Sequence, residues 1–252
     1  MLVESHVTGL LLWAAGFCLW IILIYGFLTA EIVRSIKPPL SEGMHGGWLV
    51  LVVATQSLAV LAPLVAQTGE QLRNDLLFFS AVSLYFLGWA LYVVLVTLIF
   101  YRLLYFTLEP EGFTPSYWIN MGSIAITAVA GCLLAQRGSA IFFMNEMAPL
   151  LKGLAFFSWV LATWWLPLLI LLEIWRDFLK KIPVHYGPDY WDIVFPLGMY
   201  SVASFELGRT IGYPFLGIVS EAVFYPALIL WIITFAGVAV SVFRRIVPTR
   251  IP

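Results

Sequence analysis

The 252-residue chain is 62% hydrophobic and only 11% charged, and its mean hydropathy is +0.96. Soluble domains carry about a quarter charged residues, so this composition excludes an ordinary soluble fold and indicates a protein solvated by lipid. The net charge of -1 leaves no basic surface for nucleic acid, which is not expected as a partner. Cys18 and Cys132 both lie in apolar stretches, so neither a disulfide framework nor a reactive thiol is indicated.

Seven apolar stretches are each about twenty residues long, which is enough to cross roughly 30 Å of hydrocarbon. They lie near residues 10–31, 47–66, 76–101, 117–135, 153–173, 191–210 and 222–243. The first stretch lacks a basic flank before it and is followed by Glu31 and Arg34, which favours a mature helix over a signal peptide. The connections are short. The sequence therefore predicts an all-α membrane protein of about seven spans, with a single transmembrane domain over residues 1–252.

Lysine and arginine are distributed unequally between alternate connections. One side carries nine of them, and these are Arg34, Lys37, Arg102, Arg176, Lys180, Lys181, Arg244, Arg245 and Arg250. The other side carries four, namely Arg73, Arg137, Lys152 and Arg209. Cytoplasmic loops retain an excess of positive charge, so this count predicts a cytoplasmic C-terminus. With seven spans the N-terminus is then external, and the protein is expected in the cell (inner) membrane.

An internal repeat begins at each of three tryptophans. Trp48, Trp118 and Trp191 open the second, fourth and sixth spans and are separated by 70 and 73 residues, the length of one helical hairpin. Because each unit contains an even number of spans, all units enter the membrane in the same direction. The sequence therefore predicts parallel hairpin repeats around a central axis along the membrane normal.

The two helices of each repeat differ in composition. The first helices are rich in Gly, Ala, Ser and Thr, which permit close helix approach or line a narrow path. Their partners are bulky and apolar all round, as lipid-facing helices are. We therefore expect the helices beginning at Trp48, Trp118 and Trp191 to lie inside and their partners to face lipid. By the same logic the span at 10–31 is an outer helix.

These repeats resemble a known transporter family. The segments GGWLVLVVATQSLAVLAPLVA, FTPSYWINMGSIAITAVAG and YWDIVFPLGMYSVAS are similar to the fifth, seventh and ninth helices of the tellurite-resistance and C4-dicarboxylate (malic acid) transporter family, which includes the slow anion channels of plant guard cells. The resemblance covers nearly the whole chain, which corresponds to helices four to ten of the family's ten. It implies five hairpins around a central pore, conduction or export of a small anion such as a C4-dicarboxylate, tellurite or an inorganic anion, and a possible homotrimer.

Phe195 and Pro196 are the candidate gate. Proline within a helix removes one backbone hydrogen bond and is tolerated in membranes mainly where the backbone is buried or lines a cavity. In the family that the chain resembles, a phenylalanine of the ninth helix occludes the pore, and the resemblance places that role on Phe195. The alternative is that both residues are ordinary constituents of a membrane helix.

Small and uncharged polar residues on the inner helices are candidates to line the path. They are Gln56, Ser57, Asn120, Gly122, Ser123, Thr127, Gly198, Ser201 and Ser204. Weak hydrogen-bond donors favour passage of an ion over its trapping. The alternative for each is hydrogen bonding between helices, which accounts for most such residues. Glu206 and Arg209, three residues apart on one helix face, are expected to form an ion pair.

Other classes of membrane protein are disfavoured. The chain contains neither HExxH nor GxSxG, which argues against an enzyme, and its three histidines lie outside the spans, which argues against a haem protein. The last span has no lysine for a retinal Schiff base. No cofactor or metal is predicted. A non-conducting truncated fragment, or a membrane binding or receptor protein, remains the alternative to an anion channel or transporter.

Overall fold

The computed structural model describes residues 2–66, 71–138, 141–182 and 187–246, and this part of the chain is helical without any strand. The seven long helices are α1 (Leu2–Val33), α3 (Val50–Val65), α4 (Gln71–Tyr105), α5 (Ile119–Arg137), α6 (Phe142–Ile174), α7 (Trp191–Ile211) and α8 (Phe215–Ile246). A short α2 (Leu40–Gly43) follows α1, and a π-helical turn, η5 (Trp175–Leu179), extends α6. The prediction of an all-α membrane protein is confirmed.

Six of these helices are long and apolar enough to cross a membrane. The exception is α7, whose 21 residues include Asp192, Glu206 and Arg209. It packs against α5 and α8, so its polar residues need not all meet lipid. The seventh span at 191–210 stays a prediction that depends on this partly shielded helix.

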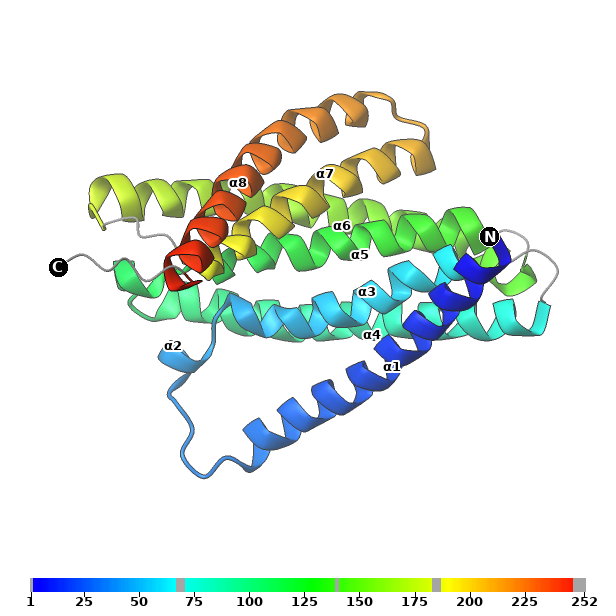
Figure 1. Cartoon of the computed structure of the whole chain (residues 1–252), viewed down its shortest axis with the longest axis horizontal. Helices are drawn as coiled ribbons and strands as arrows, with labels where there is room; N and C mark the ends of the chain where they lie inside the picture. The colour runs from blue at the N-terminus through cyan, green and yellow to red at the C-terminus, as the bar shows by residue number, and fades with distance from the viewer. Residues whose placement is uncertain (1, 67–70, 139–140, 183–186, 247–252) are drawn as a thin grey trace.

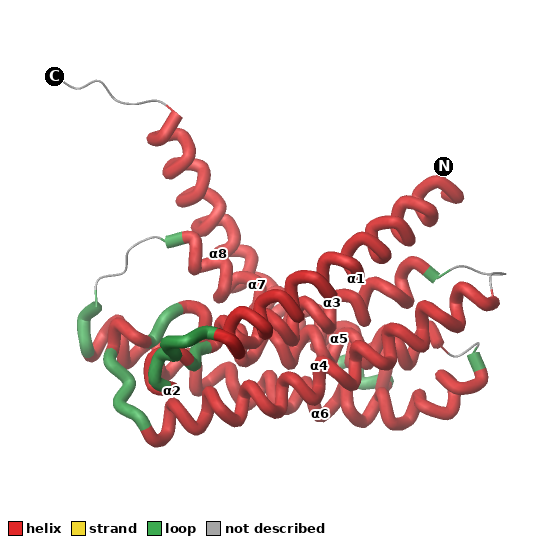
Figure 2. Tube along the Cα trace, turned by 90° about the horizontal axis from the view of Figure 1, so that it is seen from below, coloured by secondary structure: helices red, strands yellow, loops and turns green. Residues whose placement is uncertain are grey.

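Three antiparallel hairpins, α3–α4, α5–α6 and α7–α8, make up most of the molecule (Figure 1). Their first helices lie in the order α3, α5, α7, with α5 in contact with both neighbours. The second helices α4 and α6 pack behind them, and α1 lies across α3. Figure 2 shows α1 and α8 rising away from the layer of the other helices in diverging directions.

Each hairpin begins with a short 3-10 turn beside its tryptophan. These turns are η1 (Gly46–Leu49), η3 (Pro115–Trp118) and η6 (Pro188–Tyr190), and each leads directly into α3, α5 or α7. Pro115 and Pro188 occupy the first position of their turns, where a missing N–H costs nothing because no helical partner exists there. All three turns lie at the same end of the bundle (Figure 1). The repeat in the sequence is therefore also a repeat in the structure.

The central helix is α5, in which every residue from Ile119 to Ala135 is buried. Its glycines allow neighbours to approach: a Cβ at Gly131 would lie 2.8 Å from the Tyr85 hydroxyl and 3.0 Å from the Cβ of Ala155. Within the most apolar segment of each helix, 50% of the residues are buried in α3, but only 6% in α1 and 11% in α8. However, α4 was expected to face lipid and is 44% buried, because it packs against both α3 and α5.

Candidate functional site

One side of α7 is left open by the other helices. Gly198 has no heavy atom within 4 Å of an added Cβ, and Val202 and Phe205 are 44% and 49% exposed. These residues recur at intervals of three and four, the spacing of one helix face. We call this face the α7 stripe, and its members are Phe195, Gly198, Val202, Phe205 and Arg209. The predicted gate residue Phe195 is its first member and is partly exposed.

The remaining sides of α7 are used for packing. Pro196 lies against α5, where a Cβ on Gly122 would come within 2.8 Å of its Cγ. The hydroxyl of Ser201 donates to the carbonyl of Ser220 in α8 at 2.9 Å. Ser204 accepts a hydrogen bond from the indole of Trp159 in α6 at 2.9 Å. These contacts orient α7, so that Phe195 cannot turn toward α5 without moving the whole helix.

Most of the polar pore candidates are buried and hydrogen-bonded within the bundle. Gln56 is fully buried and its amide nitrogen donates to the carbonyl of Tyr85 in α4 at 3.1 Å. Asn120 donates to the carbonyl of Tyr117, while Thr127 donates to the carbonyl of Ser123, at 2.9 and 2.7 Å. Gly122 lies at the α5–α7 contact described above. Gln56 thus fits the alternative of bonding between helices, whereas Asn120 and Thr127 bond within their own segment. A part in lining a path stays a prediction for all of them.

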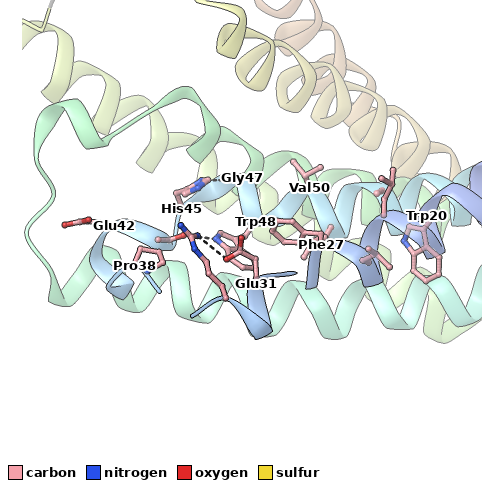
Figure 3. A pocket seen from close by; sticks show the side chains of 15 residues that line it. Trp20, Phe27, Glu31, Pro38, Glu42, His45, Gly47, Trp48 and Val50 are labelled. Atoms are coloured by element: carbon pink, nitrogen blue, oxygen red, sulfur yellow. Dashed lines mark hydrogen bonds and ion pairs between the residues drawn. The ribbon is translucent and has the colours of Figure 1, made fainter. Parts of the chain in front are cut away.

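A second open stripe runs along α3. Ser57 is exposed, its hydroxyl donating only to the carbonyl of Val53 in its own helix at 2.8 Å. The stripe consists of Val50, Ala54, Ser57, Leu61 and Leu64, again spaced by three and four residues. Val50 and Ala54 also line a groove of about 760 Å³ between α1 and α3. Figure 3 shows the aromatic rings of Trp20, Phe27 and Trp48 along this groove and the ion pair of Glu31 near its end.

The charged pair on α7 is held by α5. The Arg209 Nη1 lies 3.5 Å from Oε1 of Glu206, and Oε2 of Glu206 accepts from the amide of Gln136 in α5 at 3.2 Å. The side chain of Glu206 is 16% exposed and that of Arg209 is 61% exposed. The carboxylate is thus fixed against the bundle, whereas the guanidinium extends into the open and lies 5.7 Å from the ring centroid of Phe205.

A buried arginine at the end of the bundle that carries η1, η3 and η6 was not predicted to be a site residue. Arg102, near the C-terminus of α4, is buried, and its Nε donates to the carbonyl of Ser41 at 2.7 Å. Its guanidinium carbon lies 5.6 Å from the ring centroid of Tyr117 in η3. Arg102 also lines a cavity of about 740 Å³ together with His45. Because η3 packs against α7, this cavity and Phe195 belong to the same end of the bundle.

His45 joins the two cavities at this end, since it lines both of them. Its Nδ1 accepts from the backbone N–H of Gly47 at 3.1 Å, so the neutral ring carries its proton on Nε2. Partial burial, and next the charge of Arg102, lower the pKa of His45 below its usual value of 6.5. The imidazole is therefore neutral at pH 7, and Arg102 is the charge that dominates the inner part of the 740 Å³ cavity.

The helical hairpins and the apolar helices define a multi-pass membrane protein. The family model for voltage-dependent anion channels (SLAC1) matches residues 1–239, and the chain belongs to this family. The resemblance seen in the repeat segments is thereby confirmed.

Several curated relatives are similar to the chain. An uncharacterized membrane protein of Mycobacterium tuberculosis is 34% identical over 147 residues, which cover 58% of this chain and 74% of that protein. An uncharacterized transporter of Methanocaldococcus jannaschii is 21% identical over 197 residues, covering 77% of this chain and 55% of that protein. A sulfite efflux pump of Arthroderma benhamiae is 22% identical over 205 residues, covering 77% and 53%. The chain thus spans about half the length of these two transporters. No solved structure gives a significant match.

Proposed function

We propose that the chain forms an anion pathway across the cell membrane, running along the α7 stripe and obstructed by Phe195. The observation that carries the proposal is the unfilled space beside Gly198, one turn from Phe195, in a helix whose other sides are all packed. A benzyl group next to a glycine is the widest side chain on that stretch of the stripe. A hydrophobic constriction of this kind can gate by excluding water.

The ion is proposed to be a small anion, of which C4-dicarboxylates, tellurite and inorganic anions are the candidates. Membership of an anion channel family and similarity to a sulfite efflux pump support this class. The end of the bundle bearing Arg34, Arg102 and Arg176 is proposed to be cytoplasmic, in keeping with the positive charge that cytoplasmic loops retain. A homotrimer is the proposed assembly, on the family resemblance alone.

The gate is tested by Phe195→Ala in liposomes that contain the purified protein. We expect anion flux to rise by about tenfold, which corresponds to a barrier lowered by about 1.4 kcal/mol. Flux of chloride, nitrate, sulfite and malate would be measured separately, with potassium flux as the test of selectivity. Phe224→Ala is the matched control, since Phe224 is a 49% exposed phenylalanine on α8.

Equal anion flux in the wild type, Phe195→Ala and Phe224→Ala would refute the gate. A rise in potassium flux that equals the rise in anion flux would show a general leak and would also refute it. Absence of flux in every variant would favour the non-conducting alternative for this chain.

A further inference from the structure

Three arginines end the outer helices at the η1–η3–η6 end of the bundle. Arg34 follows α1, Arg102 lies near the end of α4 and Arg176 follows α6, with separations of 68 and 74 residues that match the tryptophan repeat. Arg34 pairs with Glu31 at 3.5 Å and Arg176 pairs with Glu173 at 3.6 Å, three residues earlier in both cases. The position three residues before Arg102 is Ile99. Arg102 therefore lacks the carboxylate that its two equivalents have.

Arg176 shows what a neutralised member of this set looks like. Its Nε lies 2.7 Å from Oδ1 of Asp177, in addition to the contact with Glu173. Its Nη1 donates to the carbonyl of Phe113 at 3.1 Å, in the loop before α5. Two carboxylates and one carbonyl thus surround the guanidinium of Arg176, a residue that is only 8% exposed. Arg176 is a structural tie between the end of α6 and the start of its own hairpin.

Arg102 makes the equivalent tie but is not neutralised. Its Nε bonds to the carbonyl of Ser41, in the loop before α3, just as Arg176 bonds to the loop before α5. It is also only 8% exposed. Within the described residues, however, no carboxylate lies within 4 Å of it and its Nη1 has no hydrogen-bond partner. A buried charge is strongly unfavourable unless it is paired, and a buried polar group without a partner calls for a bound ion or water.

The surroundings of Arg102 leave room for that missing partner. The cavity of about 740 Å³ is lined by Arg102 and His45 and by the polar residues Ser41, Thr114 and Ser116. The ring of Tyr117 lies near the guanidinium, and its hydroxyl is buried without a partner in the described part of the chain. The two carboxylates that line the cavity, Glu42 and Glu109, are exposed and outside ion-pair distance of Arg102. Water screens them, whereas the charge of Arg102 lies below the surface.

We propose that Arg102 binds a small anion carrying one negative charge, such as chloride or nitrate, which enters from this cavity. One uncompensated guanidinium matches one negative charge. The anion takes the place that Glu173 and Asp177 occupy beside Arg176. The site is separate from the proposed gate, because it lies on the loop side of η3 and does not involve the α7 stripe.

The test uses chloride NMR line broadening on the full chain purified in a neutral detergent without phospholipid. We expect the wild type to broaden the chloride line and added nitrate to reverse the effect. Arg102→Gln should reduce the broadening at least tenfold. Leu103→Asp should do the same, because it supplies Arg102 with the carboxylate that Arg176 has in Asp177, while Leu103→Asn, of equal size and without charge, should leave binding intact.

Phe195→Ala and Phe224→Ala are the remaining controls and should bind chloride like the wild type. Loss of binding in Phe195→Ala, or retention of binding in Arg102→Gln, would overturn the proposal. Equal loss in Leu103→Asp and Leu103→Asn would also overturn it, because the charge would then be irrelevant. The measurement is repeated in nanodiscs with anionic lipid. Binding that persists there supports a dissolved ion, whereas its loss assigns Arg102 to a lipid phosphate and overturns the choice of a small ion.

Discussion

The turns η1 and η3 cross closely at Gly46, where a substitution can test the contact. A Cβ on Gly46 would lie 2.0 Å from the carbonyl oxygen of Ser116, whereas ordinary van der Waals contact begins at 3.4 Å. Gly46→Ala therefore requires the two turns to separate by about 1.4 Å. A carbonyl oxygen cannot rotate away as a flexible side chain can, so the cost falls at the upper end of the range for overpacking, about 3 kcal/mol.

The assay is thermal unfolding of the purified protein in detergent, measured against Gly198→Ala. An added Cβ at Gly198 meets nothing within 4 Å, so this variant tests the loss of glycine without a clash. For a chain of this length, about 3 kcal/mol corresponds to a fall in midpoint of about 6–12 °C. Gly46→Ala should show this fall and Gly198→Ala should not. Equal midpoints for the two variants would refute the close crossing of η1 and η3.

Two further predictions concern pH and topology. Because the pKa of His45 is lowered in the folded protein, the unfolded chain binds the proton first as pH falls. The free energy of unfolding should therefore decline from about pH 6.5 downward. Thermal midpoints measured across that range should show a weaker decline in His45→Gln than in the wild type. The charged groups near His45 are Arg102, Glu42 and Glu109 in one cavity and the Glu31–Arg34 pair in the other. Reporter fusions should place the C-terminus in the cytoplasm and the N-terminus outside; two cytoplasmic ends would require an even number of spans and contradict α7 as a span.

Much of the fold follows from the sequence because lipid leaves few choices for apolar segments. Backbone groups in hydrocarbon must bond within their own segment, so a stretch of twenty apolar residues predicts a helix. The tryptophans at 48, 118 and 191 likewise located the start of each hairpin. The burial of α4 was harder to predict, because a helix that is apolar all round suits either lipid or a helix interface. Only the packing of α4 against both α3 and α5 decides between them.

The candidate site was predicted less completely. The sequence of α7 shows that small and aromatic residues both occur along the helix. Which of its faces stays exposed depends on which sides α5, α6 and α8 cover. Arg102 was counted only as a charge for orientation, although its environment makes it unusual. The signal was present in the sequence as Glu31–Arg34 and Glu173–Arg176, beside Ile99–Arg102. It becomes meaningful once the structure shows that Arg102 is as buried as Arg176.

Repeated hairpins supply equivalent positions within one chain, and the differences between them separate structural from functional residues. Arg102 and Arg176 bond to equivalent loops, so the bond to a loop carbonyl is the shared structural role. The tryptophans also differ: Trp48 donates to the carbonyl of Gly43, while Trp118 donates to Glu173, the same carboxylate that pairs with Arg176. At this end of the bundle, Trp118, Glu173 and Arg176 of the second hairpin are therefore linked to one another, whereas Trp48 and Arg102 bond only to backbone carbonyls among the contacts described. The difference between the two hairpins therefore falls at Arg102, the buried guanidinium for which an anion is proposed as the partner.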